Sequence, residues 1–168
     1  MVKELIRLEK LLSATPLSQI SNVVEDAESK DYSGYDFEAG KYQVKFRKAK
    51  ITPKKVGQFV TLWRRNADNE TEPFSETDHF DFCIILTEEN EKHGLFLFPK
   101  SVLVKQHILS THAKTGKRGF RVYPTWTKTE NRQAEKTQRW QSHYFLDFST
   151  ENNEIQKRVS EITSNIFF

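Results

Sequence analysis

Residues 41–65 read KYQVKFRKAKITPKKVGQFVTLWRR and contain nine lysine and arginine residues but no aspartate or glutamate. In the first half of this stretch, apolar and charged side chains alternate, which predicts a β-strand. Val44 and Phe46 would lie on one face of this strand, and Lys45 and Arg47 on the other. One face of the strand therefore suits a hydrophobic core, and the other suits an anion.

The second half of the stretch predicts an amphipathic helix. Thr52 is a suitable N-cap, and Pro53 fits the first helical position, where no backbone N–H is needed. Apolar residues follow at helical spacing, at Val56, Phe59, Val60 and Trp63. Lys54 and Lys55 would occupy the first turn, where the helix dipole already favours an anion. We expect the rest of the chain to be organised around this strand and helix.

The composition is that of one globular domain spanning residues 1–168. Aromatic residues make up 12% of the chain, so large rings must supply much of the buried surface. No apolar run is long enough to span a membrane, so we expect no membrane partner. The single cysteine, Cys83, has no disulfide partner within the chain, which predicts a reducing, cytoplasmic setting.

The order of the charges is more informative than the net charge of +3. After the basic stretch, residues 66–91 hold nine acidic residues and no basic one, and residues 92–128 hold eight basic residues and no acidic one. Such segregation predicts a basic face that binds an anion or a nucleic acid. The alternative is that the blocks intermingle in space and largely cancel.

The remaining patterns predict helices and strands in alternation. They are helices at 3–12 and 16–24, a loop at 25–40, a hairpin of strands 80–87 and 94–98, a helix at 101–106, a loop at 110–119, a strand at 120–123, a polar helix from Thr129 or Glu130, a strand at 143–148 and a last helix capped by Ser149 or Thr150. The fold class predicted is α/β (α+β), with a mixed central sheet flanked by helices.

The usual catalytic motifs are missing, which favours binding over catalysis. There is no Gly-rich phosphate loop, and the five histidines match no zinc-site spacing. Basic side chains neutralise phosphates, and aromatic rings stack on unpaired bases, so the predicted partner is nucleic acid, with single-stranded DNA or RNA favoured and no cofactor required. The predicted contacts are Lys45, Arg47, Lys54, Lys55, Arg64, Lys114, Lys117, Arg118 and Arg121 for phosphates, and Trp126 for a base.

Five segments carry a resemblance to a known family. They are KYQVKFRKAKITPKKVGQFVTLWRRN, TEPFSETDHFDF, GLFLFPKSVL, GKRGFRVYPTW and EKTQRWQSHYF. Over residues 35–148 the sequence resembles the MepB family of small bacterial proteins. The resemblance implies a fold like that of PD-(D/E)xK endonucleases and a role in binding nucleic acid.

A nuclease of that type needs an acid on one strand and an acid-x-Lys sequence on the next. The carboxylates hold Mg²⁺ or Mn²⁺ against the scissile phosphate, and the lysine helps to activate the attacking water. If strands 80–87 and 94–100 are that pair, Asp81 and Lys100 fit, but Phe98 stands where the second acid should be. The other pair, 94–98 and 120–123, carries no acid at all. We therefore expect a nuclease-like scaffold that binds without cleaving.

Two alternatives stay open at this point. One is an active metal-dependent nuclease that uses Asp81 and Lys100. It would recruit a further carboxylate from the acidic linker at residues 66–79, from Glu72, Glu76 or Asp78. The other is a protein-interaction module that uses the acidic 66–91 segment and the basic segments against a protein partner.

Overall fold

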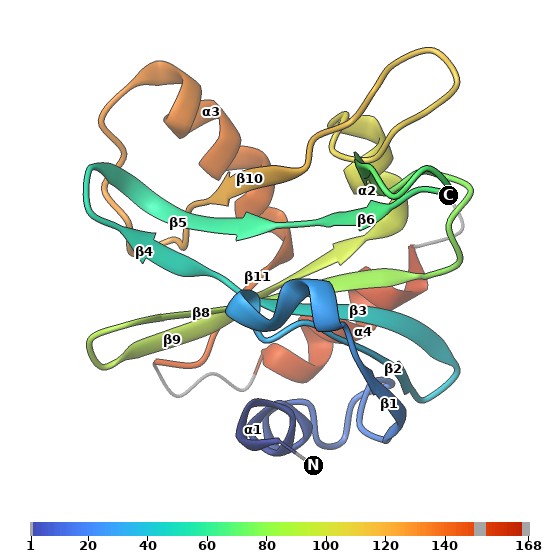
Figure 1. The fold of residues 1–168 in the computed structure, drawn as a ribbon. Coiled ribbons are helices and arrows are strands. Elements are labelled where there is room, and N and C mark those ends of the chain that lie inside the picture. Colours follow the sequence, from blue (N-terminus) through green and yellow to red (C-terminus); the bar gives the residue numbers. More distant parts are fainter. Residues whose placement is uncertain (1, 150–153, 166–168) are drawn as a thin grey trace.

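A six-stranded mixed sheet forms the centre of the computed structural model, which describes residues 2–149 and 154–165 (Figure 1). Its strands, in spatial order, are β1 (Ile20–Glu25), β2 (Tyr35–Ala39), β3 (Tyr42–Lys48), β8 (Phe82–Glu89), β9 (Lys92–Pro99) and β11 (Phe145–Asp147). Neighbouring strands are antiparallel except β3 and β8, which are parallel. The predicted mixed sheet flanked by helices is thus confirmed.

Two helices pack on one face of this sheet: α1 (Lys3–Leu11) and α4 (Ile155–Ser164). Leu5 and Leu8 of α1 and Val159 of α4 are fully buried against strand residues such as Phe46 and Ile84. Every apolar side chain of β8 is buried, on alternating faces, because the strand lies between two cores. This explains why its sequence is an unbroken apolar run.

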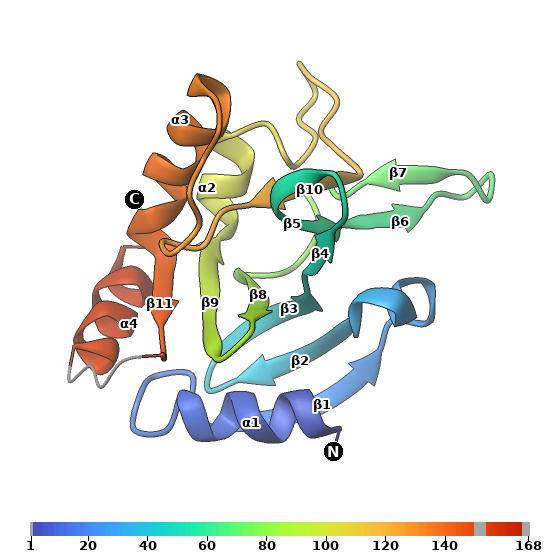
Figure 2. The same cartoon turned by 90° about the vertical axis from the view of Figure 1, so that its left-hand side faces the viewer.

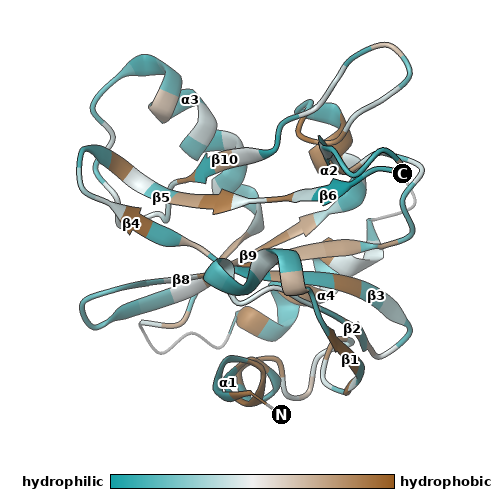
Figure 3. Ribbon diagram, in the orientation of Figure 1, coloured by the Kyte–Doolittle hydropathy of each residue, from teal (hydrophilic) through white to brown (hydrophobic). Residues whose placement is uncertain are grey.

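The other face of the sheet carries a second layer. That layer contains a three-stranded sheet of β10 (Gly119–Val122), β5 (Lys55–Thr61) and β4 (Lys50–Thr52), the ribbon of β6 (Trp63–Arg65) and β7 (Thr71–Pro73), and the helices α2 (Lys100–Lys105), α3 (Arg132–Gln141), η1 (Ala27–Tyr32) and η2 (Ser142–Tyr144). Figure 2 shows α1 and this second layer on opposite sides of the central sheet, with β6 and β7 projecting from the body. Phe96, Phe98 and Phe120 fill the core between the layers. Helix α3 is mostly hydrophilic (Figure 3), and of its residues only Ala134 and Gln141 are buried.

The prediction of a helix over residues 52–63 is wrong. These residues form the β4–β5 turn and strand β5, which pairs with β10. Gln58, Val60 and Leu62 are buried at alternate positions, which is the period of a strand. Gly57 has a φ of +83°, a conformation that no right-handed helix contains. Lys54 and Lys55 therefore lie at a hairpin turn and not at a helix N-terminus.

Two further segments differ from their predictions. The helix predicted at 16–24 is in fact strand β1, an edge strand on which Val23 and Val24 are exposed. The loop predicted at 25–40 contains η1 and β2.

Helix α3 begins after Asn131, whose side chain accepts from the Ala134 N–H at 2.8 Å.

The other predicted elements are present with shifts of a few residues. The final helix follows Glu154, while Thr150, one of its two predicted caps, lies outside the described residues. In the part of the chain that the structure describes, no helix is long and apolar enough to cross a membrane.

Candidate nucleic-acid interface

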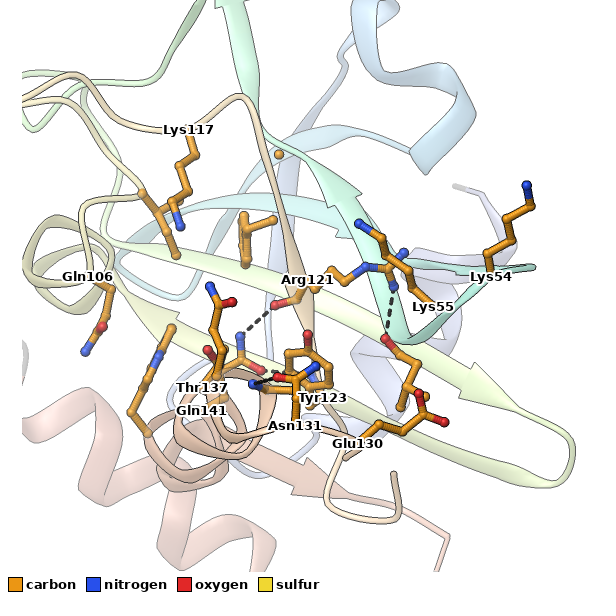
Figure 4. Close-up of a pocket in the computed structure, with 17 residues that line it drawn as sticks. Lys54, Lys55, Gln106, Lys117, Arg121, Tyr123, Glu130, Asn131, Thr137 and Gln141 are labelled. Atoms are coloured by element: carbon orange, nitrogen blue, oxygen red, sulfur yellow. Dashed lines mark hydrogen bonds between the residues drawn. The ribbon is translucent and has the colours of Figure 1, made fainter. Parts of the chain in front are cut away.

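A groove of about 490 Å³ runs along the free edge of β10 (Figure 4). Residues from the β4–β5 turn, the end of α2, the following loop and α3 line it. Four of them are cationic: Lys54, Lys55, Lys117 and Arg121. Among the described residues that line the groove, Glu130 is the one carboxylate. The groove therefore gathers positive charge from segments that are far apart in the sequence.

The hairpin turn and the loop before β10 bring three lysines to the groove. Lys54 lies in the turn between β4 and β5, and Lys55 is the first residue of β5, opposite Thr52; both side chains are exposed. Lys117 is placed by its backbone N–H, which donates to the Ile108 carbonyl at 2.9 Å. A Cβ on Gly116 would lie 2.3 Å from that carbonyl oxygen, so only glycine allows this close approach. In the view of Figure 4, Lys117 lies on one side of the groove and Lys54 and Lys55 on the other.

Arg121 lies between these lysines on β10. Its guanidinium donates to the Val56 carbonyl at 3.1 Å and also to the Thr52 hydroxyl. These two bonds fix the orientation of the group but use only part of its N–H donors. Among the described residues, no further hydrogen bond engages this guanidinium, and its remaining N–H donors suit an anion.

The buried Gln141 of α3 closes the floor of the groove. Its side-chain oxygen accepts from the Tyr123 N–H at 2.8 Å, and its amide nitrogen donates to the Arg121 carbonyl at 2.9 Å. The side chain thus satisfies the free backbone edge of β10, as a further strand would. Sequence reasoning missed Gln141, because nothing in a polar helix marks which amide is buried.

The lysines of the groove are not neutralised by nearby carboxylates. Within the described part of the chain, Lys54, Lys55 and Lys117 form no ion pair. The acidic blocks pair instead with other basic residues, for example Glu72 with Arg64 at 3.1 Å. The charge blocks therefore cancel in part, but not around the groove.

Two of the predicted contact residues are covered by the protein, contrary to the prediction. Arg47 is fully buried, and its guanidinium is 2.8 Å from a carboxylate oxygen of Asp26. Lys45 is largely covered, lies 3.1 Å from Asp36 and sits over the ring of Phe74 at 4.3 Å. Neither cation is placed to contact a phosphate, because each already has a carboxylate partner on an adjoining segment.

The other predicted residues lie away from the groove or are engaged with the protein. Arg64 pairs with Glu72, and Arg118 donates to the Thr71 carbonyl at 2.8 Å. Lys114 is exposed on the loop before β10. The half-buried Trp126 lies outside the groove, donates its indole N–H to Glu89 at 2.9 Å and meets the Phe145 ring edge-on, so its contact with a base stays a prediction.

Asp81 and Lys100 share a separate cavity of about 510 Å³ with Glu76 and His79. The Asp81 carboxylate accepts from the Gln43 backbone N–H at 2.8 Å, and Lys100 donates to the carbonyl of Asp78. Residues 2–149 and 154–165 contain no group of three or more His, Cys, Asp or Glu that could hold a metal ion.

Phe98 occupies the position that the second acid would have in the acid-x-Lys sequence ending at Lys100. It is fully buried and packs on Phe96 and Trp140, with ring centroids 5.2 and 5.5 Å away. A side chain in that place cannot ligate a metal. The residues present therefore do not fit the metal site of a PD-(D/E)xK nuclease.

Fold and groove together define a small mixed α/β protein with a basic groove along an edge strand. The family model described as MepB-like matches residues 26–147, and the chain belongs to this MepB-like family. A crystal structure of MepB is similar at 36% identity and a TM-score of 0.79, over 90% of this chain and 100% of that one. The resemblance predicted from the sequence is thus confirmed.

A bacterial homing endonuclease of known structure shares 16% identity at a TM-score of 0.42, over 83% of this chain and 91% of that one. A likeness at this level supports no conclusion about function. No curated protein matches the chain.

Proposed function

We propose that this MepB-like protein binds nucleic acid along the basic groove, with single strands favoured, on an endonuclease-like scaffold that does not cleave. The observation that carries the proposal is the convergence of Lys54, Lys55, Lys117 and Arg121 on one groove, whose described lining residues include a single carboxylate. When basic side chains neutralise phosphates, the counterions condensed on the nucleic acid are released, which makes binding favourable. The cytoplasmic setting predicted from Cys83 is part of the same proposal.

The dimensions and lining of the groove support a single strand. A volume of about 490 Å³ is that of a small-ligand site and suits a short unpaired segment better than a duplex. Tyr123 and Trp140 add partly exposed rings to the lining, and Gln106 and Gln133 add amides. Rings of this kind stack on bases without sequence preference.

The test is fluorescence anisotropy with labelled single-stranded and duplex DNA and RNA, in EDTA and at several salt concentrations. Contacts from four cations predict that log affinity falls against log salt with a slope of about −3 for single strands. The variant Lys54→Glu/Lys55→Glu/Lys117→Glu should bind at least tenfold more weakly and with a shallower slope.

A matched control carries the same change in net charge elsewhere. Lys3, Lys10 and Lys157 are exposed on α1 and α4, on the opposite face of the central sheet. Their triple change to Glu should leave the affinity within a few-fold of the unchanged protein. If both triple variants weaken binding equally, the groove is not the site.

The same samples address the two alternatives when they are also run on a gel with Mn²⁺ or Mg²⁺ in place of EDTA. Cleavage that requires Mn²⁺ or Mg²⁺ and disappears on Asp81→Ala would support the nuclease alternative, which draws on the shared cavity of Asp81 and Lys100. Failure to bind any oligonucleotide at about 50 mM salt would favour a protein-interaction module that uses the acidic 66–91 segment and the basic segments.

A further inference from the structure

The outer face of the three-stranded sheet presents a ring between two cations. Lys50 of β4 and Arg121 of β10 are both register partners of Phe59 on β5. Residues directly opposite each other in antiparallel strands project from the same face. The three side chains therefore form one row across the sheet, on the face opposite the buried Val60 and Val122.

A second cavity, of about 570 Å³, adjoins the basic groove at this row. Both cavities are lined by Lys54, Lys55, Phe120 and Arg121. The second cavity adds Thr52, Pro53 and Phe59 and includes no carboxylate among the described residues that line it. An apolar hollow thus lies directly beside a cationic one, with shared walls.

The ring of Phe59 is held in a defined place but is not fully covered. Tyr32 of η1 meets it edge-on, with ring centroids 6.4 Å apart and an interplanar angle of 69°. The Arg121 guanidinium lies 5.9 Å from the ring centroid. Gly119 allows the ring to lie close, because a Cβ there would be 2.6 Å from it. Phe59 remains partly exposed.

We infer that the apolar cavity takes an unpaired nucleobase stacked on Phe59, while the adjoining phosphates lie against Lys54, Lys55 and Arg121. This inference rests on the proposed function and adds a base-binding subsite to it. A single strand alternates anionic phosphates with flat bases of apolar face, and the two adjoining cavities offer the matching alternation. Arg121, which lines both cavities, can meet a phosphate and also contact the base through its planar guanidinium.

The experiment compares an oligothymidine of about ten nucleotides with an abasic oligomer of the same length, by anisotropy at fixed salt. Both strands carry the same phosphates, so their difference in affinity reports the bases alone. The unchanged protein should bind oligothymidine at least about fivefold more tightly than the abasic strand.

Two substitutions locate the effect at the ring. Phe59→Leu should lower the affinity for oligothymidine about fivefold or more, leave abasic binding unchanged and leave the salt slope unchanged. Phe59→Tyr keeps the ring and should bind both strands as the unchanged protein does. Ile51→Ala is the matched control, because Ile51 is an exposed apolar residue of the same hairpin that lines neither cavity.

The outcomes separate this inference from the function on which it rests. Equal binding of both strands by the unchanged protein, with a steep salt slope, would overturn the base subsite and leave phosphate binding intact. An equal loss for both strands in Phe59→Leu would also overturn it, since the ring would then act only through the fold. No binding of either strand would overturn the proposed function, and the subsite with it. The comparison on the unchanged protein holds even if a variant does not fold.

Discussion

Arg47 provides a sharp test of the structure, because the sequence placed it on the surface and the structure places it in the core. Among the described residues, Arg47 has the largest of the fully buried side chains. Its guanidinium donates to Asp26 at 2.8 Å and to the Phe46 carbonyl at 2.8 Å. The pair ties the turn before η1 to the central strand β3, far away in the sequence.

Replacing Arg47 with Met keeps much of the volume but leaves the Asp26 carboxylate without its cation. Removing one partner of a buried pair costs roughly 3–5 kcal/mol. The Asp26 side chain is 21% exposed and keeps a bond from the Glu28 N–H, so we expect the lower end, about 3 kcal/mol. For a chain of this length that corresponds to a fall in melting temperature of about 6–12 °C.

The assay is urea unfolding of Arg47→Met, Asp26→Asn and the double variant. Because the double variant leaves neither charge alone in the core, its loss should be smaller than the sum of the two single losses. Arg139→Met is the control: its pair with Glu135 is exposed, and its loss should be about 0.5 kcal/mol or less.

Oligonucleotide binding by folded Arg47→Met should be unchanged, since Arg47 is covered by protein. A loss below 1 kcal/mol, or strictly additive single losses, would refute the buried pair. A fall in affinity without a fall in stability would return Arg47 to the binding surface.

Two further predictions concern Gly57 and Cys83. Gly57→Ala should cost about 1–3 kcal/mol in urea unfolding, because its φ is +83° and a Cβ would lie 2.7 Å from the Tyr123 ring. Burial raises the pKa of the Cys83 thiol to about 12, so the folded protein should resist alkylation by iodoacetamide at about pH 8 and react once unfolded in urea. The pKa of the folded protein lies above the ordinary value of 9.0, so burial of the neutral thiol contributes its full stability below pH 9. This contribution is lost as the pH rises from about 9 to 12. Cys83→Ala should remove that part of the pH dependence of the free energy of unfolding.

The central hairpin could be predicted from the sequence because two signals agree there. Strands β8 and β9 are apolar runs of strand length, separated by a polar turn. A strand without polar positions has no face that suits solvent, so such a run is expected to be buried on both faces. In residues 52–63 two signals conflict. Val56, Phe59, Val60 and Trp63 fit a helix, whereas the strand period depends on Gln58, a polar residue that is nevertheless 1% exposed. Pairing with β10, about sixty residues later, decides between them, and no local pattern shows it.

A similar contrast separates the predicted contact residues that line the groove from those that the protein covers. Lys54 and Lys55 lie at the β4–β5 hairpin turn and Lys117 lies in the loop before β10, and among the described residues none of the three has an ion-pair partner. Lys45 and Arg47 lie on a central strand, where their surroundings depend on which segments pack beside it. Those segments turn out to carry the carboxylate partners. Because the partners are separated along the chain, the sequence alone does not show that they pair.

The change from helix to hairpin also alters the kind of anion site that the protein has. A helix N-terminus would offer backbone N–H groups, and part of its affinity for phosphate would survive the neutralisation of nearby lysines. The β4–β5 turn offers no such dipole, so the attraction comes from the ammonium groups of Lys54 and Lys55 and the guanidinium of Arg121. Binding should therefore follow the side-chain charge closely, with each lysine neutralised to Gln reducing the salt slope by about 0.7. A slope that stays unchanged in Lys54→Gln/Lys55→Gln would mean that backbone groups, and not this hairpin, hold the phosphates.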